Sequence, residues 1–171
     1  FKEFCDLSAT GRRFGGYDVS IDSEARIWKV SLGGSGDHPL KKVCFEKDIM
    51  RIGWDQYGEE PFNSTVSMNP SERSVLTYFY ETMKMGDIVL SLKDERHIDG
   101  IGIIEGEVEW LEDEDHYKRS RKVNWLAKHI SLDIHEMNMR KNLTRKTVYP
   151  LDRLSVSQVE RMLEIEYGIS N

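Results

Sequence analysis

The chain has 171 residues, of which 39% are hydrophobic and 32% charged, and its formal net charge is -6 at pH 7. This length suits one domain with a core of its own. The acidic balance argues against a generic nucleic-acid-binding surface, and the two cysteines, Cys5 and Cys44, are too few for a disulfide framework. With no membrane-length apolar run and no signal peptide, we expect a reducing, cytoplasmic setting and no membrane.

The first part of the chain differs from the rest. Residues 1–25 include the turn-rich run 11–16 and lack clean periodicity, which predicts an N-terminal extension or linker. We expect the remaining residues, 26–171, to form the domain.

Several apolar or alternating segments have the length and composition of strands. In chain order they are 26–31, 49–54, 86–92, 98–104, 122–130 and 147–150. The polar turn 93–96 joins the two central segments and predicts a hairpin. Gly100 and Gly102 leave one face of its second strand bare, so another backbone can approach closely. We expect the strand carrying Trp28 to pack there.

Helical spacing of apolar residues and capping residues predict the helices. They are 38–48 after Asp37, 71–85 from Ser71, and a terminal helix that opens at Ser155 or Ser157 and ends near Gly168. The stretches 55–68 and 109–118 are expected to be loops, and 131–146 fits no single pattern. The fold class is therefore mixed α+β, with about six strands and helices packed outside.

Patterns typical of catalysis and metal binding are missing from the sequence. The five histidines form no HxH or HExxH motif, and there is no GxSxG elbow. The glycine-rich run 33–36 lacks the Walker lysine and favours a flexible loop over a phosphate site. We expect a binding domain rather than an enzyme, with no cofactor and no metal site.

Aromatic residues bracket the central hairpin and suggest a small barrel with an aromatic mouth. Trp54 follows Gly53 and precedes polar residues, so its ring is expected at the rim, whereas Trp28 fits either core or pocket. Trp110, His116 and Tyr117 lie in or beside the acidic loop. Planar side chains next to positive charge are what binding a flipped base requires.

Charge is segregated along the chain. An acidic run, 105–115, is followed directly by basic residues, which can form a local basic face or simply two solvated faces. We assign nucleic-acid backbone contacts to Lys118, Arg119, Arg121, Lys122, Arg145 and Lys146. Since Arg121 and Lys122 alternate along a strand, at most one of them should face the nucleic acid.

Taken in order, the motifs resemble those of EVE domains, members of the PUA superfamily together with the YTH readers of modified RNA. They are Ile27-Trp28-Lys29-Val30-Ser31, Ile52-Gly53-Trp54-Asp55, Gly86-Asp87-Ile88-Val89, Gly100-Ile101-Gly102-Ile103-Ile104, Arg121-Lys122-Val123-Asn124-Trp125 and Thr147-Val148-Tyr149. The resemblance covers about residues 26–166. It is greatest to the modified-base-specificity domains of McrB-type restriction proteins.

This resemblance implies a compact PUA/EVE-like β-barrel whose aromatic pocket accepts a modified base flipped out of nucleic acid. It maps a cage tryptophan onto Trp54 and a base-edge contact onto Ser31, and it leaves Trp110, His116 and Tyr117 as candidates for the second aromatic wall. The chain departs from the YTH pattern because no tryptophan-containing loop directly precedes Arg121. The base-pocket candidates are Trp28, Ser31, Trp54, Ser91, Trp110, His116 and Tyr117.

The expected function is recognition of a methylated or otherwise modified base in DNA, which targets a modification-dependent restriction nuclease. The expected partners are this DNA, the remainder of an AAA+ motor protein and a nuclease subunit, and the isolated domain should be monomeric. Because the sequence begins with Phe1, we expect it to be excised from a longer protein. A modified-RNA reader and a protein or small-ligand interaction module remain alternatives. The sequence leaves open which modified base is preferred.

Overall fold

A computed structural model describes residues 11–14, 17–33, 39–137, 143 and 146–167 of the chain. Its strands are β1 (Gly11–Phe14), β2 (Tyr17–Ser20), β3 (Ile27–Val30), β4 (Ile49–Ile52), β5 (Ile88–Leu92), β6 (His97–Ile104), β7 (Glu109–Trp110), β8 (Arg119–Asp133) and β9 (Val148–Pro150). The helices are α2 (Pro39–Lys47), α3 (Pro70–Thr77) and α4 (Val156–Tyr167). Short helical turns are η1 (Asp55–Tyr57), η2 (Pro61–Asn63), η3 (Tyr78–Thr82) and η4 (Ile134–Met137).

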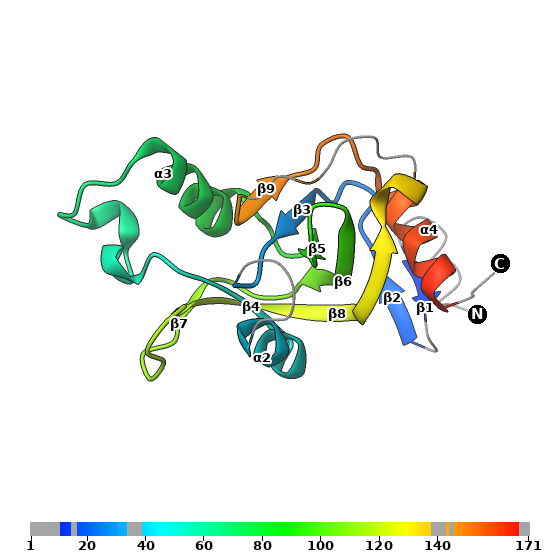
Figure 1. The fold of residues 1–171 in the computed structure, drawn as a ribbon, viewed down its shortest axis with the longest axis horizontal. Coiled ribbons are helices and arrows are strands. Elements are labelled where there is room, and N and C mark those ends of the chain that lie inside the picture. Colours follow the sequence, from blue (N-terminus) through cyan, green and yellow to red (C-terminus); the bar gives the residue numbers. More distant parts are fainter. Residues whose placement is uncertain (1–10, 15–16, 34–38, 138–142, 144–145, 168–171) are drawn as a thin grey trace.

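The main sheet is curled into a half-barrel with the strand order β4-β8-β6-β5-β3-β9, and β7 pairs with β8 beside this path (Figure 1). Strands β3 and β5 run parallel, and the other pairs are antiparallel. Within the described residues β4 and β9 do not pair, so the curl stops short of a closed barrel. The predicted α+β class, with about six strands and helices packed outside, is confirmed.

Both faces of the sheet are covered. One core includes Ile88, Leu90 and the α4 residues Met162 and Leu163. The other joins the opposite face to α2 and to α3 with η3, which lie on different sides of the half-barrel in Figure 1. All five β5 residues are buried, and a strand buried on both faces reads as a continuous apolar run.

The segment expected to be an N-terminal extension or linker contains regular structure. Strands β1 and β2 pair antiparallel, and Figure 1 places them beside α4. Ile21, which follows β2, is buried in the core that contains α4. These two strands are absent from the predicted set, because a short strand pair needs only a few residues and leaves little periodicity. The assignment of residues 1–25 to an N-terminal extension or linker stays a prediction. The domain boundary at residue 26 stays a prediction.

The helix caps correct one expectation and decide another. Asn69, rather than Ser71, caps α3: its side chain accepts from the Glu72 N–H at 2.9 Å, and the Glu72 carboxylate accepts from the Asn69 N–H. At α4, Ser155 Oγ accepts from the Gln158 N–H at 3.2 Å, so Ser155 is the cap rather than Ser157. The other predicted helix limits, Asp37 and Gly168, lie outside the described residues.

The bare strand face packs against different neighbours from those predicted. β6 lies between β5 and β8, so the Trp28 strand does not pair with it. A Cβ atom added at Gly102 would lie 2.4 Å from Val123 Cγ1 and 2.8 Å from Trp125 Cε3, both on β8. The missing side chain therefore makes room for the Trp125 ring, at a point where the pairing register of β6 and β8 shifts.

Candidate functional site

A pocket of about 280 Å³ lies where the half-barrel stays open, and we call it the seam pocket. The ends of β3 and β4, the β7–β8 loop and the residue before β9 line it. Its lining residues are Ser31, Gly33, Arg51, Ile52, Gly53, Trp54, Tyr117 and Thr147. On one side, the Ser31 N–H donates to the Thr147 carbonyl at 2.8 Å. The structure thus brings together three predicted pocket residues: Ser31, Trp54 and Tyr117.

The two aromatic residues of the seam pocket have unusual backbone conformations. Trp54 has φ 64° and Tyr117 has φ 52°, which is the left-handed region that residues other than glycine rarely adopt. The Tyr117 ring packs beside Gly53, since a Cβ atom added there would lie 3.6 Å from ring carbons Cδ1 and Cε1. Such conformations cost roughly 1–3 kcal/mol each and persist only where the surroundings fix them.

Arg51 on β4 holds the Tyr117 side of the pocket. This arginine is 6% exposed. Its Nε donates to the Tyr117 carbonyl at 2.8 Å and its Nη2 to the His116 carbonyl at 2.7 Å. The Glu114 carboxylate lies 3.5 Å from the same Nη2. A side chain from one strand therefore fixes the loop that leads into its neighbour.

Arg119 on β8 makes the reciprocal connection to the Trp54 side. It is fully buried; its Nη2 donates to the Trp54 carbonyl at 2.7 Å and its Nε to the Gly53 carbonyl at 3.2 Å. Its Nη1 donates to the Tyr80 hydroxyl at 2.7 Å. Burial raises the pKa of Tyr80, although Arg119 opposes this rise. Arg51 on β4 thus fixes the backbone at Tyr117, and Arg119 on β8 fixes the backbone at Trp54.

Three polar groups of the seam pocket have hydrogen-bonding capacity to spare. They are the Ser31 hydroxyl, the Thr147 hydroxyl and Nη1 of Arg51. Within the described part of the chain none of the three has a hydrogen-bond partner, and none is a fully enclosed atom. Polar groups beside aromatic residues in one pocket are typical of a small-ligand site, and the volume is close to the lower end of the usual range of about 300–1,000 Å³.

Four predicted pocket residues lie outside the seam pocket. Trp28 is fully buried, its Nε1 donates to Asp87 Oδ2 at 3.0 Å, and it belongs to the core. Ser91 is also fully buried. Trp110 Nε1 donates to Glu112 Oε2 at 2.8 Å, and the exposed His116 reaches the site only through its carbonyl. For Trp28 and Ser91 the pocket prediction is wrong, because both strands carrying them are covered on both faces.

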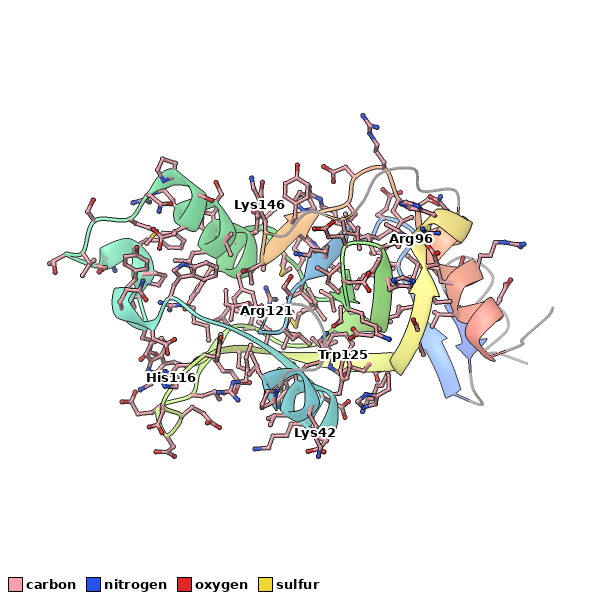
Figure 2. The ribbon with its side chains drawn as sticks, viewed as in Figure 1. Lys42, Arg96, His116, Arg121, Trp125 and Lys146 are labelled. Atoms are coloured by element: carbon pink, nitrogen blue, oxygen red, sulfur yellow. The ribbon has the colours of Figure 1, made fainter. Side chains whose placement is uncertain are left out.

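The predicted phosphate contacts divide by burial. Arg121 is 1% exposed; its Nη1 donates at 3.0 Å to each of the Phe79 and Met83 carbonyls, and burial lowers its pKa. Figure 2 shows Arg121 inside the molecule, whereas Lys146 lies toward the upper edge and His116 at the lower left. Arg119 and Arg121 therefore hold structure together, and their assignment to phosphates is wrong.

The other cations remain near the surface. Lys122 and Lys146 are exposed, which agrees with at most one of Arg121 and Lys122 facing a ligand. Lys118 is partly buried, and its Nζ lies 5.6 Å from the centre of the Trp110 ring. Arg145 lies outside the described residues.

Sequence reasoning missed Arg51 and Thr147. A signal for Arg51 was present, since it interrupts an otherwise apolar strand between Met50 and Ile52. Thr147 was predicted only as the first residue of a strand motif, and it reaches the site because β9 pairs with β3.

The described residues have neither a metal-binding cluster nor a membrane-spanning helix. They contain no group of three or more His, Cys, Asp or Glu residues that could hold a metal ion. None of their helices has the length and apolar character needed to span a membrane.

Solved structures share this fold at low sequence identity. The YTH domain of Zygosaccharomyces rouxii MRB1 protein, solved in complex with N6-methyladenosine RNA, is 14% identical, with 90% of this chain and 94% of that chain covered and a TM-score of 0.51. The Mmi1 YTH domain is 9% identical, covering 83% and 97%, with a TM-score of 0.48. Agrobacterium tumefaciens protein Atu2648 is 11% identical, covering 82% and 92%, with a TM-score of 0.40. The chain therefore has a YTH-like fold.

Comparison at the sequence level gives the family. No curated protein matches the chain significantly. One family model, described as "Domain of unknown function (DUF8426)", matches residues 28–152. That span contains β3 from its second residue, all later strands up to β9, and every residue lining the seam pocket. Because the match extends over more than half of the sequence, the chain belongs to the DUF8426 family.

Proposed function

We propose that this chain is a binding module that accepts a modified nucleobase, flipped out of nucleic acid, into the seam pocket. The observation that carries the proposal is that Trp54 and Tyr117 line one pocket, at the open edge of the sheet, together with three polar groups that have no hydrogen-bond partner among the described residues. A flipped base needs a flat surface for stacking and polar groups for its edge. The seam pocket offers both.

Each lining group has a role in this proposal. Trp54, which is partly exposed, stacks on the base. Arg51 can only donate, so its Nη1 pairs with a carbonyl oxygen or ring nitrogen of the base. The Ser31 and Thr147 hydroxyls can donate or accept, so they form hydrogen bonds with the rest of the base edge. The modifying group would occupy the part of the seam pocket that an unmodified base leaves empty.

The nucleic-acid backbone is expected to approach from the side of Lys146. This exposed lysine precedes the pocket residue Thr147, and its Nζ lies 5.4 Å from the centre of the Tyr149 ring. On the opposite side, Tyr117 follows the acidic stretch 112–115, which would repel phosphates. The positively charged surface on which phosphates can bind is therefore smaller than the basic residues of the sequence suggest.

We further propose that the bound polymer is DNA and that the module delivers a motor and a nuclease to it, without catalysis of its own, in the cytoplasm. The motif resemblance to McrB-type specificity domains supports this choice. The fold likeness to an RNA-bound YTH domain supports base reading and makes modified RNA the competing polymer. The net charge of -6 would favour a protein or small-ligand partner instead.

Binding to matched oligonucleotides tests the proposal. Fluorescence anisotropy would compare unmodified strands with strands carrying 5-methylcytosine, 5-hydroxymethylcytosine, N4-methylcytosine or N6-methyladenine, in DNA and in RNA. We expect one modified DNA to bind at least tenfold more tightly than its unmodified match, with affinity falling as salt rises. A preference for RNA would overturn the DNA assignment. Equal binding of all strands would overturn base reading.

A further inference from the structure

A second cavity lies apart from the seam pocket and shares no lining residue with it. Its volume is about 560 Å³, and it lies between α2, the β5–β6 turn and an irregular part of β8. We call it the lysine cavity because Lys41, Lys42 and Lys93 line it together with Asp99 and His129. Nothing in the proposed base-reading function uses these residues.

A double irregularity in the sheet places Asp99 here. On the β5 side, Ile98 pairs with Leu92 and Gly100 with Ser91, so Asp99 has no partner residue. On the β8 side, Leu132 and Lys128 pair with the same two β6 residues, which leaves 129–131 opposite Asp99. His129 in this stretch has φ 55°. Bulges of this kind redirect side chains and are frequent beside functional sites.

Asp99 is buried and only partly satisfied. The residue is 6% exposed, and its Oδ2 accepts from Lys41 Nζ at 2.7 Å. The same ammonium donates to the Leu92 carbonyl at 2.8 Å. Asp99 Oδ1, however, has no hydrogen-bond partner within the described residues. A buried carboxylate oxygen without a donor is costly and calls for an explanation, and a ligand that brings an N–H group supplies one.

Three lysines line the same cavity against two carboxylates, Asp99 and Glu46, and this excess of positive charge points to an anionic group on that ligand. Lys42 is exposed and Lys93 partly so, and in the described part of the chain neither ammonium has an ion-pair partner. His129 and Ile130 add flat and apolar surface, and the His129 ring packs edge-on against Phe45 at 5.1 Å. The cavity volume falls in the usual range for small-molecule sites.

We propose that the lysine cavity binds a nucleotide whose base carries an exocyclic amino group, such as a cytidine nucleotide. The amino group donates to Asp99 Oδ1, as acidic side chains do to cytosine N4, and the phosphate lies between Lys42 and Lys93. Because Oδ1 is shielded in the ligand-free chain, the bond requires whatever side chain covers this atom to move. A free nucleotide and a nucleotide within a strand offer the same chemistry.

Calorimetric titration with cytidine and uridine monophosphates tests this site. The two differ at the base position that is an amino group in one and a carbonyl oxygen in the other. We expect cytidine monophosphate to bind about five- to 150-fold more tightly. The double variant Lys42→Ala/Lys93→Ala should lose at least tenfold for both, whereas Lys84→Ala, an exposed lysine that lines neither pocket, should bind as the unchanged chain does.

Asp99→Asn provides a second measurement, since its amide can place an N–H where the carboxylate had an oxygen. We expect this variant to shift the preference toward uridine monophosphate. Should it fail to fold, the comparison on the unchanged chain still decides. Equal affinity for both nucleotides, or no cytidine monophosphate binding at millimolar concentration, would overturn the proposal.

Competition between cytidine monophosphate and a cytosine-containing oligonucleotide separates the two sources of the ligand. Displacement by the oligonucleotide, lost in the double lysine variant, identifies a nucleotide within a strand. Failure to displace identifies a free nucleotide. Trp54→Ala, which alters only the seam pocket, should leave cytidine monophosphate binding unchanged, so this result is independent of the base-reading proposal.

Discussion

At the scale of single residues, two tryptophans illustrate how burial separates packing from binding. Trp28 is fully buried and hydrogen-bonded to Asp87, whereas Trp54 is partly exposed at the seam pocket. We predict that Trp54→Ala loses about 1–3 kcal/mol of binding to the preferred modified strand and leaves the melting temperature nearly unchanged. Trp28→Phe should do the reverse, losing roughly 1–3 kcal/mol of unfolding free energy because the Asp87 bond disappears. A Trp54→Ala protein that binds normally would remove Trp54 from the site.

Arg119 supports the same pocket from behind. We predict that Arg119→Met lowers the unfolding free energy on the order of 3 kcal/mol, because the Trp54 and Gly53 carbonyls lose a charged donor. Urea unfolding measures this loss. The matched control is Lys122→Met, an exposed residue of the same strand, which should stay within about 0.5 kcal/mol of the unchanged chain. Equal effects of the two substitutions would contradict the role given to Arg119.

At the scale of elements, the β6–β8 pair depends on Gly102. An added methyl group would overlap Val123 and Trp125, so we predict that Gly102→Ala costs roughly 1–3 kcal/mol through overpacking. Thermal unfolding would show it. Gly53→Ala is the control, since its Cβ would meet only ordinary contacts at 3.6 Å. A Gly102→Ala protein as stable as the unchanged chain would mean that β8 moves away without cost.

The elements that sequence reasoning predicted are those with a local signal. β5 and β6 have long apolar runs because they are buried on both faces, and α2, α3 and α4 show helical spacing and nearby caps. Arg119 and Arg121 were misassigned because the sequence does not distinguish an arginine that donates to buried carbonyls from one that lies in solvent. Their acceptors, such as the Trp54 and Met83 carbonyls, lie far away in sequence.

At the scale of the whole molecule, one buried lysine links stability to pH. Lys29 on β3 is fully buried, its ammonium donates to the Lys146 carbonyl, and burial lowers its pKa from 10.5 to about 8. Between pH 8 and pH 10.5 the unfolded chain keeps this proton while the folded chain loses it, so stability rises with pH in that window. Above pH 9 Cys44 acts in the opposite direction, because burial raises its pKa from 9.0 to about 12.

We therefore predict that the unfolding free energy increases by up to about 1 kcal/mol between pH 7.5 and pH 9. Urea unfolding at a series of pH values measures the slope, and Lys29→Met should flatten it. An equally steep rise in that variant would assign the effect to another group.

The unclosed sheet makes the width of the seam pocket a property of every strand between its two sides. Ser31 and Thr147 belong to one end of the strand order and Arg51 and Trp54 to the other, with β8, β6 and β5 between them. The width of the pocket therefore depends on the curvature of the whole sheet, because a change of curvature at any intervening strand moves the two sides of the pocket apart or together. The irregular pairings at Gly100 and Gly102 lie on β6, near the middle of the strand order. A substitution at either of these glycines would then change the width of the seam pocket while leaving its lining residues the same.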